Sequence, residues 1–181
     1  MKEIKLQIPE GKKAEWVNDV LTLVDEKPQD VTERIKTFDD AVRELGENHP
    51  LVKEWAVSGQ NLSPDLEAYL KLRIIAAALN EGWEPQFTEN ECRWYPWFTL
   101  WTEEELKDKT EEWKKEHSLW LFGGSSDLGS YCGLAYSASR NAWSDSIAYF
   151  SARLAVKSKE LAVYFGKQFV EIWADYVLIR K

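Results

Sequence analysis

Apolar and polar residues alternate near the start of the chain, in a pattern typical of β-strands. The stretch IKLQI (4–8) alternates strictly, and EWVNDVLTLV (15–24) has two apolar runs separated by Asn18 and Asp19. Asn and Asp tolerate the positive backbone angles that tight hairpin turns require. The pattern therefore predicts a strand over residues 4–8 and a short hairpin that turns at Asn18-Asp19.

Helical spacing replaces this alternation in the next part of the chain. The segment DVTERIKTFDDAVRELG (30–46) has Asp30 and Glu33 at the spacing of a capping box and stops at Gly46, so it predicts one helix. HPLVKEWAVSG (49–59) predicts a second, shorter helical piece.

The clearest helix runs from Ser63 to about Glu81. Ser63 is a good N-cap, Pro64 suits the first helical position and Gly82 supplies the stop. Its middle, YLKLRIIAAALN, is apolar on nearly every face. We therefore expect it to be the central buried helix.

Strand-forming residues dominate several short segments of the second half. ECRWYPWFTLW (91–101) is rich in aromatic and β-branched residues, and Pro96 requires a sheet edge or a bend. SLWLFGG (118–124) predicts a buried strand that runs into a glycine turn. FSARLAV (150–156) predicts a closing strand.

Two further helices are predicted among and after these strands. Thr102 and Glu105 have capping-box spacing, which predicts a charged helix or helical turn. Ser158 can cap a last helix over KELAVYFGKQFVEIWADYVL (159–178), where the apolar residues keep helical spacing.

Together these elements predict an α+β protein. A length of 181 residues and an apolar content of 44% suit a single hydrophobic core. We expect one domain over residues 1–181, with a helical scaffold portion at 1–90. Residues 91–181 would form an irregular β region followed by a C-terminal helix.

The charge and hydropathy of the chain exclude some classes of binding partner. A net charge of −8 disfavours nucleic acid and anionic membrane surfaces, which attract clustered Lys and Arg. No run of eighteen apolar residues is present, so we expect no membrane insertion. The start, MKEIKLQIPEGKK, lacks the apolar stretch of a signal peptide. We therefore expect the protein to be cytoplasmic when made.

Candidate chemistry is sparse. The two cysteines, Cys92 and Cys132, could form one disulfide, but buried or surface thiols are the favoured interpretation. With His49 and His117 as the only histidines, a zinc site would lack ligands at the usual spacing. The GGSSDLG stretch has neither the nucleophile pattern GxSxG nor a phosphate-binding or dinucleotide-binding pattern. We expect no enzymatic activity, no metal and no cofactor.

The segment 123–149, GGSSDLGSYCGLAYSASRNAWSDSIAY, has a composition of its own. It holds seven of the twelve serines of the chain, with four glycines and three tyrosines. Tyr and Trp supply contact area at low entropic cost, while Ser, Gly and Asn supply adaptable hydrogen bonds, as in antibody binding loops. A binding surface explains this composition, and so does a β-rich region on the inner side of the domain.

The residues missing from segment 123–149 favour the binding surface. It contains no Lys, Glu, Gln or Met, whereas 43 of the other 154 residues are of these four types. Together with Trp, these are the amino acids that a codon ending in a pyrimidine cannot encode. An Asn-type codon randomised at its adenines would leave this composition, and Trp143 would then lie outside the randomised set.

Residues 119–156 resemble the variable segment of diversity-generating-retroelement target proteins. The resemblance rests on Gly123-Gly124-Ser125, on Cys132-Gly133-Leu134-Ala135-Tyr136 and on Ser151-Ala152-Arg153-Leu154-Ala155. The flanking sequences resemble small proteins of gut bacteria and their prophages. The resemblance implies a C-type-lectin-like fold over 91–181, in which solvent-facing residues are mutated to change partner. It also implies a protein that is virion-associated or displayed at a cell surface.

The resemblance leads us to expect a non-enzymatic binding protein whose ligand face is formed by the loops of residues 126–149. Its partner would be a protein or a surface glycan, and the chain would form a homo-oligomer or dock to a larger assembly. Tyr131, Tyr136 and Tyr149 would be the strongest contacts and Arg140 a charged contact. The side chains expected at the ligand are Asp127, Ser130, Tyr131, Tyr136, Ser137, Ser139, Arg140, Asn141, Ser144, Asp145, Ser146 and Tyr149.

Two other functions stay open at this point. In the first, the protein is a phage structural or accessory subunit, and the Ser/Gly/Tyr-rich segment packs against neighbouring subunits. In the second, an enzyme that processes sugars uses Trp94, Trp97 or Trp101 as a stacking platform. That enzyme would need a pair of carboxylates converging on the platform.

Overall fold

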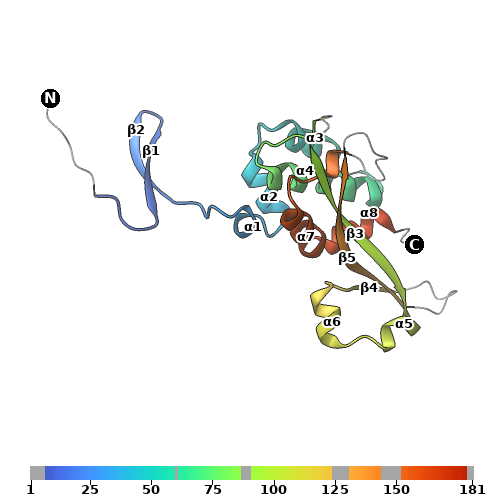
Figure 1. The fold of residues 1–181 in the computed structure, drawn as a ribbon. Coiled ribbons are helices and arrows are strands. Elements are labelled where there is room, and N and C mark those ends of the chain that lie inside the picture. Colours follow the sequence, from blue (N-terminus) through green and yellow to red (C-terminus); the bar gives the residue numbers. More distant parts are fainter. Residues whose placement is uncertain (1–6, 60, 87–90, 124–130, 144–151, 179–181) are drawn as a thin grey trace, which may run out of the picture.

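The structure is a computed structural model that describes residues 7–59, 61–86, 91–123, 131–143 and 152–178. It is a mixed α and β protein with a helical body, a three-stranded antiparallel sheet and an N-terminal hairpin (Figure 1). The described elements are β1 (Lys12–Val17), β2 (Val20–Asp25), α1 (Val31–Arg34), α2 (Phe38–Leu45), α3 (Pro50–Ser58), α4 (Pro64–Asn80), β3 (Cys92–Thr102), α5 (Glu103–Lys107), α6 (Glu111–Glu116), β4 (Trp120–Gly123), β5 (Tyr131–Trp143), a 3₁₀ helix (Ala152–Leu154), α7 (Lys159–Gln168) and α8 (Val170–Val177).

The N-terminal hairpin has its turn at Asn18 and Asp19, which confirms the prediction. The two turn residues have positive φ angles of 49° and 63°, as a type I′ turn requires. The strands β1 and β2 pair antiparallel along their whole length. In Figure 1 an extended segment separates this hairpin from the helical body. The strand predicted over residues 4–8 lies mostly outside the described residues.

Two helices, α1 and α2, replace the single helix predicted over residues 30–46, so that prediction is wrong. The chain leaves the helical conformation at Ile35, where φ is −116° and ψ is 91°. The Ile35 carbonyl accepts a hydrogen bond from the Tyr164 hydroxyl at 2.6 Å, and the Lys36 carbonyl accepts one from the Gln168 amide at 2.8 Å. A continuous helix would have used these carbonyls internally. Contacts with α7, far along the chain, therefore break the helix.

A capping box starts α2 rather than α1. The Thr37 hydroxyl accepts from the Asp40 amide at 3.1 Å, and the Asp40 carboxylate accepts from the Thr37 hydroxyl at 2.8 Å and the Thr37 amide at 2.9 Å. The bond from the Thr37 hydroxyl is the main cause that lowers the pKa of the Asp40 carboxyl to about 2. At α1, Asp30 caps the helix by accepting from the Thr32 amide.

Helix α4 lies in the core, as its apolar faces predict. Leu72, Ile75 and Leu79 are fully buried. The helix begins at Pro64 and ends before Glu81, which takes the left-handed conformation. Helices α2, α7 and α8 pack against α4, so both portions of the chain contribute to one core.

The sheet has the strand order β3-β5-β4, and every neighbouring pair is antiparallel. The long edge strand β3 confirms the strand predicted over residues 91–101, and Pro96 lies on this edge strand as expected. Strand β4 confirms a strand within residues 118–124, but it is not buried throughout, because Leu121 is 56% exposed. Helix α7 packs against both β3 and β5.

The strand predicted over residues 150–156 does not form within the described part of that range. Residues 152–154 are a 3₁₀ helix instead. Only Val156 takes part in β pairing, through an isolated bridge in which its amide and carbonyl bond to those of Trp94 at 3.0 and 3.1 Å. Leu154 and Val156 are fully buried in the core, which favours this compact arrangement over an extended strand.

The last helix is also interrupted. Ser158 caps α7 as predicted, since its hydroxyl accepts from the Leu161 amide at 3.2 Å. The helix then breaks at Phe169 (φ −113°), where α8 begins. Phe169 is buried and its ring packs edge-on against Phe165 and Tyr164, so core packing fixes the break.

The buried side chain of Asn80 joins the end of α4 to residues 155–157. It is 4% exposed. Its amide nitrogen donates to the Ala155 carbonyl at 2.8 Å, and its oxygen accepts from the Lys157 amide at 3.0 Å. Since Val156 lies between these two residues and bridges to Trp94, this amide also sets the position of β3 against α4.

We predict that Asn80→Ala destabilises the protein by about 2–3 kcal/mol, because it leaves the Ala155 carbonyl and the Lys157 amide without their partner. Urea denaturation followed by circular dichroism measures this loss. The matched control is Asn48→Ala at an exposed position, with an expected change below about 0.5 kcal/mol. Equal stability of the two variants would contradict the role of Asn80.

The capping box of α2 predicts a pH-dependent stability. The folded pKa of Asp40 is lowered to about 2, so its carboxylate stabilises the fold above the ordinary pKa of 3.8, and this contribution is lost as pH falls through about 2. We expect Asp40→Asn to lower the stability at pH 7 by about 1 kcal/mol. The difference in free energy of unfolding between this variant and the wild type should disappear as pH falls from about 4 to 2. Denaturation midpoints across this range measure it, with Asp39→Asn in the same turn as control.

Candidate functional site

The segment with the unusual composition contains the central strand of the sheet. Residues 131–143 form β5, which pairs with β3 on one side and β4 on the other. The expectation of loops throughout residues 126–149 is therefore wrong for this range. Ser, Gly and Asn are typical of turns, but strand pairing on both sides outweighs that preference here.

The predicted ligand residues fall into three groups by their place in the structure. Tyr136 and Ser137 have described side chains. Tyr131, Ser139, Arg140 and Asn141 lie on β5 and pair in register with Gly123, Pro96, Tyr95 and Trp94. The others lie outside the described residues: Asp127, Ser130, Ser144, Asp145, Ser146 and Tyr149.

Tyr136 does not present its side chain to solvent, which corrects the expectation for this residue. It is 6% exposed, and its ring packs edge-on against Phe98 with centroids 6.3 Å apart. Helix α7 approaches closely because Gly166 has no side chain: a Cβ there would lie 2.7 Å from Cδ2 of Tyr136 and 2.6 Å from Cβ of Pro96. Burial thus explains why β5 lacks charge at residues 133–136, as the inner-region interpretation proposed.

Ser137 is exposed and occupies a β-bulge. Trp97 pairs with Ala138 and Phe98 pairs with Tyr136, so Ser137 is the extra residue on β5. Bulges re-aim side chains and occur often beside functional sites. Ser137 is the predicted ligand residue whose described side chain faces solvent.

A cavity of about 240 Å³ lies beside this bulge. It is lined by residues of β3, β5 and the helical excursion that connects β3 to β4 through α5 and α6. The lining residues are Thr99, Trp101, Lys109, Trp113, His117, Tyr136 and Ser137. The excursion is held against β5 where the Tyr136 amide donates to the His117 carbonyl at 2.9 Å.

Aromatic rings and one cation give the cavity its chemical character. Trp113 stacks on His117 with centroids 4.2 Å apart and meets Trp101 edge-on at 5.2 Å. The Lys109 ammonium lies 4.4 Å from the Trp101 centroid and 5.0 Å from that of Trp113. Such a group can stack a flat or sugar-like surface and donate a hydrogen bond to it. We name these four residues the aromatic cluster.

Sequence reasoning found only part of the aromatic cluster. Trp101 belonged to the predicted stacking platform, but Trp94 packs against the hydrophobic core instead. Trp113 and His117 sit in a stretch that we interpreted only as charged. Their spacing of four residues, which places them on one face of a helix, was the available signal. No carboxylate is among the residues that line the cavity, so the pair that a sugar-processing enzyme needs is not seen in this lining.

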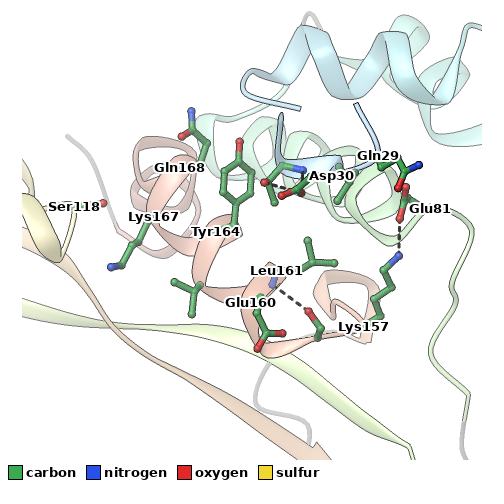
Figure 2. Close-up of a pocket in the computed structure, with 14 residues that line it drawn as sticks. Gln29, Asp30, Glu81, Ser118, Lys157, Glu160, Leu161, Tyr164, Lys167 and Gln168 are labelled. Atoms are coloured by element: carbon green, nitrogen blue, oxygen red, sulfur yellow. Dashed lines mark hydrogen bonds and ion pairs between the residues drawn. The ribbon is translucent and has the colours of Figure 1, made fainter. Parts of the chain in front are cut away.

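A larger hollow, of about 660 Å³, lies between α1 and α7 (Figure 2). Two of its charged groups, Lys157 and Glu81, form an ion pair, which Figure 2 shows. Lys157 Nζ donates to Glu81 at 2.7 Å, and Arg34 donates to the same carboxylate at 2.6 Å. The bond from Lys157, followed by that from Arg34, lowers the pKa of Glu81. These contacts join α1 to the C-cap of α4 and to the segment that precedes α7.

The other two carboxyls of this hollow are likewise held in their ionised form. The backbone amide of Thr32 lowers the pKa of Asp30, and the Glu160 amide lowers the pKa of its own side chain. The Tyr164 hydroxyl donates to the Ile35 carbonyl. A carboxyl with a lowered pKa is a poor general acid at neutral pH. The described contacts of this hollow therefore hold α1 against α7, chiefly through the bond from Tyr164 to Ile35.

The described residues also bear on a disulfide, a metal site and a membrane span. Cys92 pairs with Trp143 and Cys132 with Thr102, at opposite ends of the β3–β5 ladder, about 30 Å apart and too far for a disulfide. In the described ranges no group of three or more His, Cys, Asp or Glu could hold a metal ion. No helix in those ranges has the length and apolar character to cross a bilayer.

Comparison of the chain with protein-family models, curated proteins and solved structures finds no match.

Exposure along β5 predicts where substitutions are tolerated. We expect Ser137→Asn to change the free energy of unfolding by less than about 0.5 kcal/mol, because Ser137 is an exposed bulge residue. We expect Ala135→Asn to cost about 2 kcal/mol or more, because Ala135 is buried and the larger amide does not fit. Denaturation of the two variants measures both. Equal losses would contradict the assignment of Ser137 to the tolerant surface.

Proposed function

We propose that this protein is a non-enzymatic binding protein that recognises a protein or a surface glycan through segment 123–149 and the neighbouring aromatic cluster. The observation that carries the proposal is the absence of Lys, Glu, Gln and Met from 27 consecutive residues of a highly charged chain. Codon-restricted diversification accounts for this absence along the whole segment. Among the described side chains of the segment, burial accounts for it at residues 133–136 but not at the exposed Ser137.

The arrangement of β5 supports a recognition role. Its central place between β3 and β4 gives a fixed scaffold, and the described neighbours of the bulge include an exposed serine and a solvent-accessible aromatic cluster. A diversified binding protein needs a rigid scaffold that stays constant and exposed, adaptable residues that can vary. Residues that hold the scaffold, such as Leu134 and Ala135, are buried and are expected to stay constant.

The aromatic cluster favours a ligand with a flat or weakly polar face. Trp101, Trp113 and His117 gather aromatic surface beside the bulge, although Trp113 and His117 stack on each other, and Lys109 adds a cation that suits a hydroxyl or a carbonyl. A pyranose ring or a protein side chain of similar shape meets these conditions. We further propose that residues 91–181 follow the C-type-lectin-like plan, and the small antiparallel sheet is compatible with this plan.

The DNA that surrounds the gene tests the proposal. We expect a second copy of codons 125–149 nearby that differs from the gene mainly at adenines, together with a reverse transcriptase gene. Sequencing the gene in a population of the source should show changes confined to those codons, at exposed positions such as Ser137.

Codons 63–81, which encode the buried helix α4, provide the matched control and should show neither a repeat nor excess variation. The absence of both the repeat and the reverse transcriptase gene would overturn diversification. Variation spread evenly over the two sets of codons would do the same.

A further inference from the structure

One face of the N-terminal hairpin carries four apolar residues with Lys12 at its end, and the opposite, mixed face alternates polar residues with Val17, Val20 and Val24. Directly paired residues on antiparallel strands share a face, so the register places Ala14 with Leu23 and Trp16 with Leu21 on the same side. Trp16 is 74% exposed, Leu23 42% and Leu21 38%. We name these four residues the hairpin face. The other side carries an ion pair between Lys13 and Glu15, with Nζ and Oε1 2.6 Å apart.

The hairpin face resembles a strand surface that covers a core, yet no helix or other strand of the described ranges packs over it. Strands β1 and β2 pack chiefly with each other, and Figure 1 shows them apart from the helical body. Two strands alone are marginally stable in water, and exposed apolar faces of this kind mark interaction sites.

We propose that the hairpin face binds the same face of a second copy of this chain. A two-fold axis parallel to the strands lays β1 of one copy over β2 of the other. The register then sets each Trp16 against Leu21 of the partner subunit and each small Ala14 against Leu23 of the partner subunit. Large side chains thus meet smaller ones at every level, and the contact is self-complementary as a two-fold interface must be.

The distribution of charge favours this occupant at this place. Residues 1–27 contain five lysines and six acidic residues, so this segment is close to neutral. Residues 28–181 contain 18 basic and 25 acidic residues and repel a second copy. The hairpin is therefore where two acidic chains approach each other with least repulsion, and its separation from the body keeps the acidic parts apart.

The size of the hairpin face sets the strength of the dimer. Four side chains from each copy bury less than the roughly 1,200 Å² of a standard interface. Interfaces below this size are typical of transient complexes, so we expect the dimer to be reversible. Added salt strengthens it, because salt screens the repulsion between the bodies and leaves the apolar contact in place.

Sedimentation velocity of the full chain over a concentration series tests this. We expect the mass to rise from the 21.1 kDa monomer towards twice that value. Trp16→Glu on the hairpin face should weaken the dimer at least tenfold. The matched control is Val20→Glu on the mixed face, where Val20 is 62% exposed, and it should leave the dimer within about twofold of the wild type.

Thermal unfolding of both variants should match the wild type, since the hairpin packs little against the core. A wild type that stays monomeric throughout overturns the proposal and leaves a different protein as the occupant of this face. A dimer that survives Trp16→Glu overturns it in favour of another interface, and so does equal weakening by both substitutions.

Discussion

The buried amide of Asn80 is the constraint on which the rest of the structure depends. It sits at the end of the central helix and satisfies two backbone groups of residues 155–157, which arrive from the far end of the chain. Because Val156 lies between those groups and bridges to Trp94, the amide fixes how the sheet meets the helices. An apolar side chain at this position would fill the space, but it would leave both backbone groups unpaired.

Strand β5 is positioned by a series of close contacts that begins at this amide. Residues 155–157 lead directly into α7, and Gly166 lets that helix approach Pro96 on β3 and Tyr136 on β5. The Tyr136 amide in turn binds the His117 carbonyl, which brings the aromatic cluster beside Ser137. The cavity thus depends on packing that starts in the helical body, although its lining comes from the sheet and the excursion.

Local signals in the sequence predicted the elements whose boundaries are set by neighbouring residues. Asn18-Asp19 predicted the hairpin turn, Pro64 predicted the start of α4 and Ser158 predicted the start of α7, because caps and turns depend on a few adjacent residues. Ser63 occupies the N-cap position of α4 as expected, but its side chain makes no capping hydrogen bond. Elements set by distant contacts could not be predicted in this way. The helix break at Ile35 depends on Tyr164, and the burial of Tyr136 depends on a glycine thirty positions later. The composition of segment 123–149 located the candidate site along the chain. The cavity beside it could not be predicted, because its lining residues come together only in the folded protein.

The separation of the hairpin from the body has a consequence for how the protein can change over generations. Substitutions around the bulge of β5 alter packing in the sheet and its covering helix, and β1 and β2 take little part in either. Selection can therefore act on the two ends of the molecule independently. Under the two proposals made above, a variant that acquires a new ligand surface would keep its assembly behaviour, and a change in assembly would leave an existing specificity intact.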